Sequence, residues 1–110
     1  MPSRRPIQAL VAIIVAIVLS APAAADGSAS ERERGLLELL RQDCGSCHGM
    51  TMKGGLGPAL LPATLDDIPD EVLVKIILDG VPETPMPPWR PLLKAHEAAW
   101  MVKQLKDGLK

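Results

Sequence analysis

The spacing of hydrophobic residues changes once along the chain, at about residue 26. Apolar residues form an almost unbroken run over 7–19, whereas farther on they recur three or four positions apart within three stretches. This recurrence places them on one face of a helix, and the sequence lacks the alternation that is typical of a strand. The pattern predicts an all-α fold with three main helices, over about 31–43, 68–79 and 92–106, and long loops between them.

The predicted helices begin at residues that are suited to that position. Ser30 is followed three residues later by a glutamate, which makes a capping box, and Asp67 is a suitable N-cap for the second helix. Because the first and last helices each carry one apolar stripe, we expect them to cross, with Gly35 or Leu36 near Trp100. The apolar positions expected in the core are Leu36, Leu39, Leu40, Val72, Leu73, Ile76, Ile77, Leu93, Trp100, Met101 and Leu105. The segments 49–63 and 81–91 are too rich in glycine and proline to form regular structure and are predicted as loops.

The N-terminal stretch has the layout of a secretory signal peptide. Two arginines precede the apolar run, and small residues in an A-x-A arrangement end at Ala25. An uncleaved membrane anchor is the alternative, but a spanning helix needs about 20 apolar residues and this run is shorter. We expect residues 1–25 to be removed, with cleavage after Ala23 as a less favoured variant. Residues 26–110 would then form a secreted domain without stable membrane association.

Composition limits both the core and the partners of this domain. The chain has Trp89 and Trp100 but no Tyr or Phe. A domain this small with so few aromatic residues usually needs a staple such as a disulfide, a metal or a large cofactor. The formal net charge is −1 and no block of like charge stands out, so nucleic acid is not an expected partner.

The segment Cys44-Gly-Ser-Cys47-His48 carries the most specific chemistry in the sequence. C-x-x-C-H is the signature of covalent haem attachment, because two thiols add across the two vinyl groups at one porphyrin edge and the next residue lies under the iron. We therefore predict one covalent haem c, held by Cys44 and Cys47, with His48 as the proximal iron ligand. The haem also supplies a large apolar body for the core.

Three other interpretations of the motif are weaker. A disulfide between the two cysteines would close a loop too short to constrain much. A thioredoxin-like redox pair needs a strand–helix–strand setting, which the pattern does not predict. A zinc site would have to use Cys44, Cys47, His48 and His96, and ordinary zinc spacing does not place a histidine directly after the second cysteine.

The sixth iron ligand has five candidates: Met50, Met52, Met86, His96 and Met101. The first two lie too close behind the motif to reach the far face of the ring. Met101 falls on a helical stripe, where methionine usually fills a core, and His96 lies among charged residues that indicate a solvated surface. Met86 follows far enough downstream and sits in a segment stiffened by prolines. We predict Met86 as the distal ligand, which gives the iron one histidine and one methionine and a raised potential.

Pro58 is the predicted support of the proximal ligand. A carbonyl near Pro58 would accept the free N–H of His48 and so fix the tautomer and orientation of the ring. An ordinary loop proline is the alternative.

These motifs resemble those of a known family. The three-helix order, C-x-x-C-H at the end of the first helix, Gly57-Pro58 and a Met-Pro loop resemble class I cytochromes c over nearly all of the chain after residue 25. The stretches 44–61, 77–80 and 84–91 are similar to cytochrome c55X, a periplasmic monohaem cytochrome of denitrifying bacteria that is encoded beside cytochrome cd1 nitrite reductase. The resemblance implies the class I cytochrome c fold and, by position, the same four haem-binding residues.

The function expected from this resemblance is electron transfer and not catalysis. The resemblance implies a periplasmic one-electron carrier of denitrification that donates to cytochrome cd1 nitrite reductase. One alternative is a redox accessory role in haem d1 biosynthesis. The other is a haem enzyme or gas sensor, which gains weight only if Met86 does not bind the iron. We also expect Met50, Met52, Lys53 and Leu56, together with 87–89, to present a mainly apolar docking patch with few charges, the alternative being that Met52 and Leu56 simply cover the haem.

Overall fold

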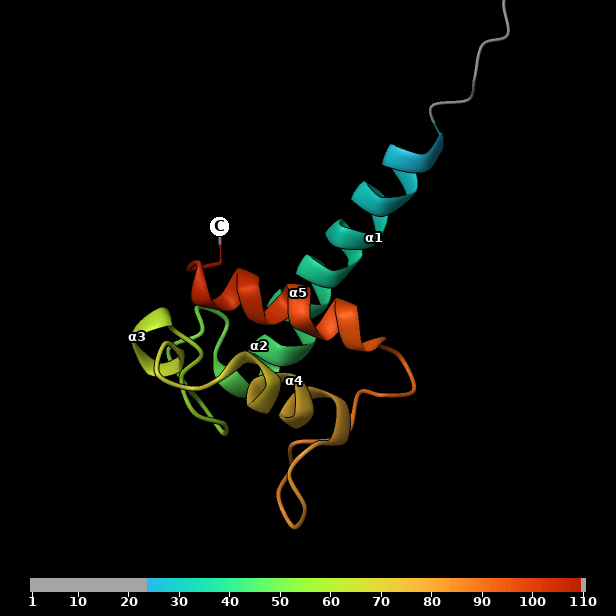
Figure 1. Cartoon of the computed structure of the whole chain (residues 1–110). Helices are drawn as coiled ribbons and strands as arrows, with labels where there is room; N and C mark the ends of the chain where they lie inside the picture. Colours follow the sequence, from blue (N-terminus) through green and yellow to red (C-terminus); the bar gives the residue numbers. More distant parts are fainter. Residues whose placement is uncertain (1–23, 110) are drawn as a thin grey trace, which may run out of the picture.

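The computed structural model describes residues 24–109, with side chains from residue 30 onward, so nearly all of the predicted signal peptide lies outside the described residues. The elements are α1 (Ala24–Leu39), η1 (Leu40–Cys44), α2 (Gly45–His48), α3 (Pro62–Leu65), α4 (Asp70–Asp79) and α5 (Ala95–Lys106) (Figure 1). The predicted all-α fold is confirmed for the described range, which holds helices and loops but no strand. No helix in this range is long and apolar enough to span a membrane.

The first helical run is longer than the sequence predicted. α1 begins at Ala24, so Ser30 lies inside the helix and its assignment as the N-cap is wrong. Residues 24–29 contain three alanines and no proline, and alanine is the strongest helix former. The run passes through the π-helical turn η1 into α2, since Leu39 and Cys44 both keep right-handed helical dihedral angles. The cysteine motif therefore ends one nearly continuous helix (Figure 1).

The two later helices begin two to three residues after their predicted starts. α4 begins at Asp70, because a proline at 69 disfavours the helical conformation at Ile68, and Asp67 is therefore not its N-cap. α5 begins at Ala95 after an extended Lys94, whose backbone N–H donates to the Glu97 carboxylate at 3.0 Å. The sequence analysis missed α3, a single turn that interrupts the predicted loop at Pro62.

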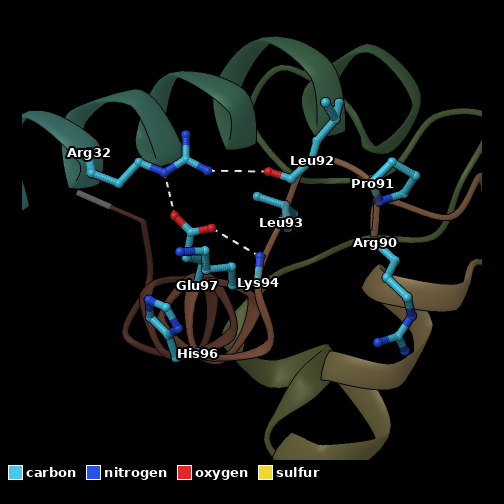
Figure 2. A pocket seen from close by; sticks show the side chains of 8 residues that line it. All are labelled: Arg32, Arg90, Pro91, Leu92, Leu93, Lys94, His96 and Glu97. Atoms are coloured by element: carbon cyan, nitrogen blue, oxygen red, sulfur yellow. Dashed lines mark hydrogen bonds and ion pairs between the residues drawn. The ribbon is translucent and has the colours of Figure 1, made fainter.

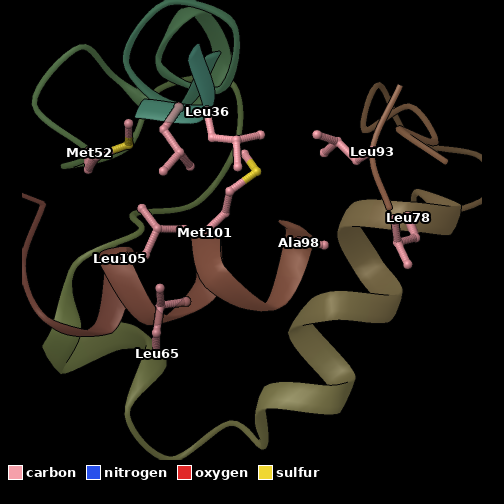
Figure 3. Packing of buried hydrophobic residues seen from close by; sticks show 9 residues of the cluster. Leu36, Met52, Leu65, Leu78, Leu93, Ala98, Met101 and Leu105 are labelled. Atoms are coloured by element: carbon pink, nitrogen blue, oxygen red, sulfur yellow. The ribbon is translucent and has the colours of Figure 1, made fainter. Parts of the chain in front are cut away.

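The core forms where α5 crosses the other helices. Met101 is 0% exposed and points from α5 toward Leu36 of α1 (Figure 3). The buried apolar residues are Leu36, Leu40, Met52, Leu65, Leu78, Leu93, Ala98, Met101, Val102 and Leu105. The predicted stripe of α4 is partly wrong, because Val72 is exposed and Leu78 is buried in its place. Trp100 is half-buried and packs against these buried residues.

The first and last helices cross as predicted, but Gly35 takes no part in the contact. Gly35 is exposed, and a Cβ atom built on it would meet nothing within 4 Å. The contact is made by larger side chains, because the stripe that faces α5 begins at Leu36. The expected close approach of an indole to Gly35 is therefore wrong.

An ion pair between an exposed arginine and a buried glutamate joins the two helices at this crossing. Glu97 of α5 is 7% exposed and accepts a hydrogen bond from Arg32 of α1 as well as the one from Lys94 (Figure 2). Arg32 also donates to the carbonyl of Leu92 at 3.3 Å. The hydrogen bond from Arg32 and the bond from the Lys94 backbone lower the pKa of Glu97 to about 2. The charged form of Glu97 therefore stabilises the folded protein.

Glu97→Gln tests this clamp, because glutamine keeps the hydrogen bond to the Lys94 backbone and loses only the charge. We expect the free energy of unfolding of the variant to be about 1.5–3 kcal/mol lower near neutral pH, the range for a hydrogen bond to a charged group. The pKa of Glu97 lies below its ordinary value of 4.5, so the difference should persist above pH 4.5 and shrink as the pH falls toward 2. Denaturant unfolding across this pH range measures it. Glu31→Gln removes an exposed carboxylate from the same helical run and should change little, and a pH-independent difference for Glu97→Gln would contradict the clamp.

Candidate haem site

The end of the first helical run presents the three residues of the C-x-x-C-H motif. Cys44 is the last residue of η1, and Cys47 and His48 lie in α2. Both cysteines are half-buried free thiols, so no disulfide occupies the sulfur atoms that haem attachment requires. Burial and, to a smaller extent, the neighbouring Asp43 carboxylate raise the pKa of the Cys44 thiol to about 11. The surroundings of Cys44 therefore disfavour a charged group and suit an apolar ring.

The His48 ring is oriented by the loop that follows it. Its Nδ1 lies 2.7 Å from the carbonyl oxygen of Pro58. Because a carbonyl only accepts, Nδ1 carries the proton and the lone pair of Nε2 stays free for a metal. This is the contact that the sequence analysis expected near Pro58, and it fits a histidine that ligates haem iron.

The same loop folds back tightly over the motif. The N–H of Gly57 donates to the Cys47 carbonyl and that of Gly54 to the His48 carbonyl, both at 2.8 Å. A Cβ atom on Gly57 would lie 2.7 Å from Cε1 and 2.8 Å from Nδ1 of His48. Only glycine lets the backbone come this close to the imidazole. Gly57 was expected only as part of the Gly57-Pro58 motif, and its close approach to the imidazole was not predicted. The glycine directly before Pro58 is the feature of the sequence that indicates it.

The predicted distal ligand comes from a different segment of the chain. Met86 is half-buried in the loop between α4 and α5. Its backbone N–H donates to Thr84 Oγ1 at 3.3 Å, and its carbonyl accepts from Val81 at 3.2 Å. The structure thus brings Cys44, Cys47, His48 and Pro58 together directly, whereas Met86 takes its position from contacts with its own loop and α4.

The competing candidates have other surroundings. Met101 is fully buried in the core, as predicted, and His96 is exposed beside Arg32 and Glu97 in an open groove (Figure 2). Met50 is 60% exposed, whereas Met52 is 4% exposed and packs in the core. Within residues 24–109 no three His, Cys, Asp or Glu side chains gather in a way that could hold a metal ion. The zinc interpretation, which needs His96 beside the motif, therefore has no support in the described range.

The helical run that ends in C-x-x-C-H, the loop that supports its histidine and the crossing of α1 and α5 together form the class I cytochrome c fold. Residues 30–103 match the family model described as cytochrome C oxidase, cbb3-type, subunit III. The c-type cytochrome NirC has a similar structure, with a TM-score of 0.71 and 52% identity over 73% of this chain and 94% of that chain.

Characterised relatives define the family more narrowly. Cytochrome c55X of Pseudomonas aeruginosa is 52% identical over 72% of this chain and 66% of the relative, and cytochrome c55X of Paracoccus denitrificans is 44% identical over 84% and 89%. The chain belongs to the cytochrome c55X family. It is an electron-carrying c-type cytochrome with covalently bound haem c, and its two cysteines allow one such group.

A structure of dihydro-heme d1 dehydrogenase NirN in complex with DHE is also similar. It has a TM-score of 0.58 and 36% identity, over 63% of this chain but 15% of that chain. The match is therefore confined to a cytochrome-like part of a much larger protein.

Gly57→Ala tests the support of the proximal histidine. The added methyl group would overlap the imidazole, so the loop must move away and weaken the bond from Nδ1 to Pro58. That bond makes the imidazole more basic, so we expect a higher reduction potential in redox titration and an altered ligand-field spectrum. The matched control is Gly35→Ala. It adds the same methyl group in open space within a helix and should leave the potential unchanged and raise stability by about 0.5–1 kcal/mol. Equal potentials for wild type and Gly57→Ala would show that the loop does not control His48.

Proposed function

We propose that this electron carrier of denitrification donates single electrons to cytochrome cd1 nitrite reductase. The observation that carries the proposal is the His48–Pro58 contact beside Cys44 and Cys47, because it prepares one imidazole nitrogen for iron at a covalent haem site. The haem supplies a centre that accepts and releases one electron at its iron. The residues of the chain hold that centre, orient its proximal ligand and limit the rearrangement that accompanies a change of charge.

Met86 is proposed as the distal ligand. The half-buried position of Met86 and the hydrogen bonds at Thr84 and Val81 support this role, since an ordered loop lowers the entropy cost of holding a weak thioether ligand. With one imidazole and one thioether ligand, the iron has no open position for a substrate. An enzyme or gas sensor would need such a position, so this ligand set favours electron transfer.

The surface next to the motif supports transient docking of a redox partner. Met50 and Leu56 are 60% and 76% exposed and lie on the loop that folds over the C-x-x-C-H segment. Met52 was expected in the same patch, but it is 4% exposed and its side chain joins the core. We therefore propose a smaller apolar docking patch, made of Met50 and Leu56. Its weak local charge suits an encounter that salt affects little.

A role in haem d1 assembly is the second candidate function. The similarity to a structure of dihydro-heme d1 dehydrogenase NirN supports it, because that protein carries a cytochrome-like part of the same fold. The same redox centre would then exchange electrons with an enzyme of haem d1 assembly instead of nitrite reductase. In both roles we propose that residues 1–25 direct secretion to the periplasm and are removed.

Met86→Ala tests the distal ligand. We expect the variant to lose the weak near-infrared band of sulfur-to-iron charge transfer, to have a lower reduction potential and to bind cyanide or carbon monoxide readily. Absorption spectra of the oxidised protein and redox titration measure these changes. Met50→Ala is the matched control, because it removes an exposed methionine near the motif and should keep the band. If His96→Ala abolished the band and Met86→Ala did not, Met86 would be the wrong ligand.

Stopped-flow mixing tests the partner and the docking patch. The reduced protein should transfer electrons to cytochrome cd1 at a rate that depends weakly on ionic strength, and Leu56→Ser should slow the transfer several-fold. Leu92→Ser is the control, since Leu92 is 65% exposed but lies in the groove beside Arg32. A steep fall in rate with salt would mean that charged residues steer docking. Rapid transfer with a haem d1 assembly enzyme, and none with cytochrome cd1, would favour the second function.

A further inference from the structure

The loop that carries Met86 is closed at its base by an ion pair. Asp79 is the last residue of α4, and Arg90 lies eleven positions later, after Met86 and the prolines that follow it. Nε and Nη2 of Arg90 both donate to Oδ1 of Asp79, at 2.8 and 2.6 Å. The two ends of the loop are therefore held side by side.

Backbone hydrogen bonds join the same two segments. The N–H of Trp89 donates to the carbonyl of Ile77, and the N–H of Arg90 donates to that of Leu78, both at 3.0 Å. Leu78 is buried and Trp89 packs against the core cluster, so these bonds anchor the base of the loop to the interior of the protein. The position of Arg90 is thus coupled to the end of α4.

The end of α4 lies directly against the segment that bears the proposed ligand. Gly80 has a φ of 67°, and a Cβ atom on it would lie 2.7 Å from the Met86 carbonyl oxygen and 2.8 Å from the Pro87 carbonyl carbon. The prolines at 85, 87 and 88 make the backbone between Met86 and Arg90 stiff. A displacement of Asp79 or Arg90 should therefore also displace Met86.

The ion pair contributes little to the stability of the whole domain, because its side chains are 60% and 41% exposed. An exposed pair can still decide whether one loop opens locally, since opening a loop requires much less free energy than global unfolding. We propose that Asp79 and Arg90 are positioning residues, which keep the loop closed and so control how often the distal side of the haem becomes accessible. The proposal rests on Met86 being the distal ligand.

Imidazole binding to the oxidised protein tests the proposal. Imidazole must wait for Met86 to leave the iron, so its apparent affinity reports the fraction of molecules with an open loop. We expect Arg90→Gln and Asp79→Asn to bind imidazole about two- to fivefold more tightly, the factor that corresponds to one exposed ion pair. Arg90→Lys keeps the charge and should therefore bind imidazole with nearly the affinity of the wild type. Added salt should narrow the difference in affinity between the wild type and Arg90→Gln.

The controls separate loop closure from general stability and from ligand identity. Lys103→Gln breaks an ion pair of similar exposure, with a 2.7 Å contact to Asp107, at the far end of α5 and should leave imidazole binding unchanged. The denaturation midpoint of Arg90→Gln should stay near that of the wild type.

Met86→Ala provides the reference state. This variant should bind imidazole tightly, and adding Arg90→Gln to it should change nothing. Unchanged imidazole affinity in Arg90→Gln, or an equal gain in the Met86→Ala background, would overturn the positioning role while leaving Met86 as the ligand. Unchanged affinity in Met86→Ala itself would overturn both proposals.

Discussion

The packing of α1 against α5 is the contact on which the rest of the structure depends. The cysteine motif lies at the end of the helical run that begins with α1, so α1 must be fixed before the motif has a defined position. Leu36, Leu40 and Met101 make this contact without a buried aromatic ring, and the charged pair of Arg32 and Glu97 fixes its angle. A small leucine-rich core usually needs a further large group to complete the interior, and the haem supplies one.

The site is assembled from three segments that differ in rigidity. The helical run supplies the cysteines and His48, and the loop at 54–58 returns over the motif through backbone hydrogen bonds and the Pro58 carbonyl. The loop after α4 carries Met86, the proposed distal ligand, and its contacts tie it to α4 rather than to the motif. His48 is therefore fixed by short local connections, whereas the proposed distal ligand depends on a loop that is held at its base.

Features encoded by local sequence could be predicted, and those that depend on tertiary packing could not. C-x-x-C-H and the carbonyl at Pro58 could be identified because both are fixed by spacing within a few residues. α4 begins two residues later than its apolar stripe predicts, because Pro69 disfavours the helical conformation at Ile68. The burial of Met52 and Leu78, and the exposure of Val72, follow from where α5 lies, which periodicity within one helix does not define. The Arg32–Glu97 clamp joins residues far apart in sequence and left no local signal.

The wide turn η1 has a consequence for insertions and deletions in this family. A π-helical turn holds one more residue than an α-helical turn, and here it lies between the stripe that faces α5 and the first cysteine. Loss of one residue from 41–43 would rotate everything after it by about 100° relative to α1, because an α-helix has 3.6 residues per turn. The core leucines would keep their places while the thiols turned to another side of the helix. The length of this segment is therefore under stricter constraint than its composition, and homologous chains should tolerate substitutions there far better than changes in residue number.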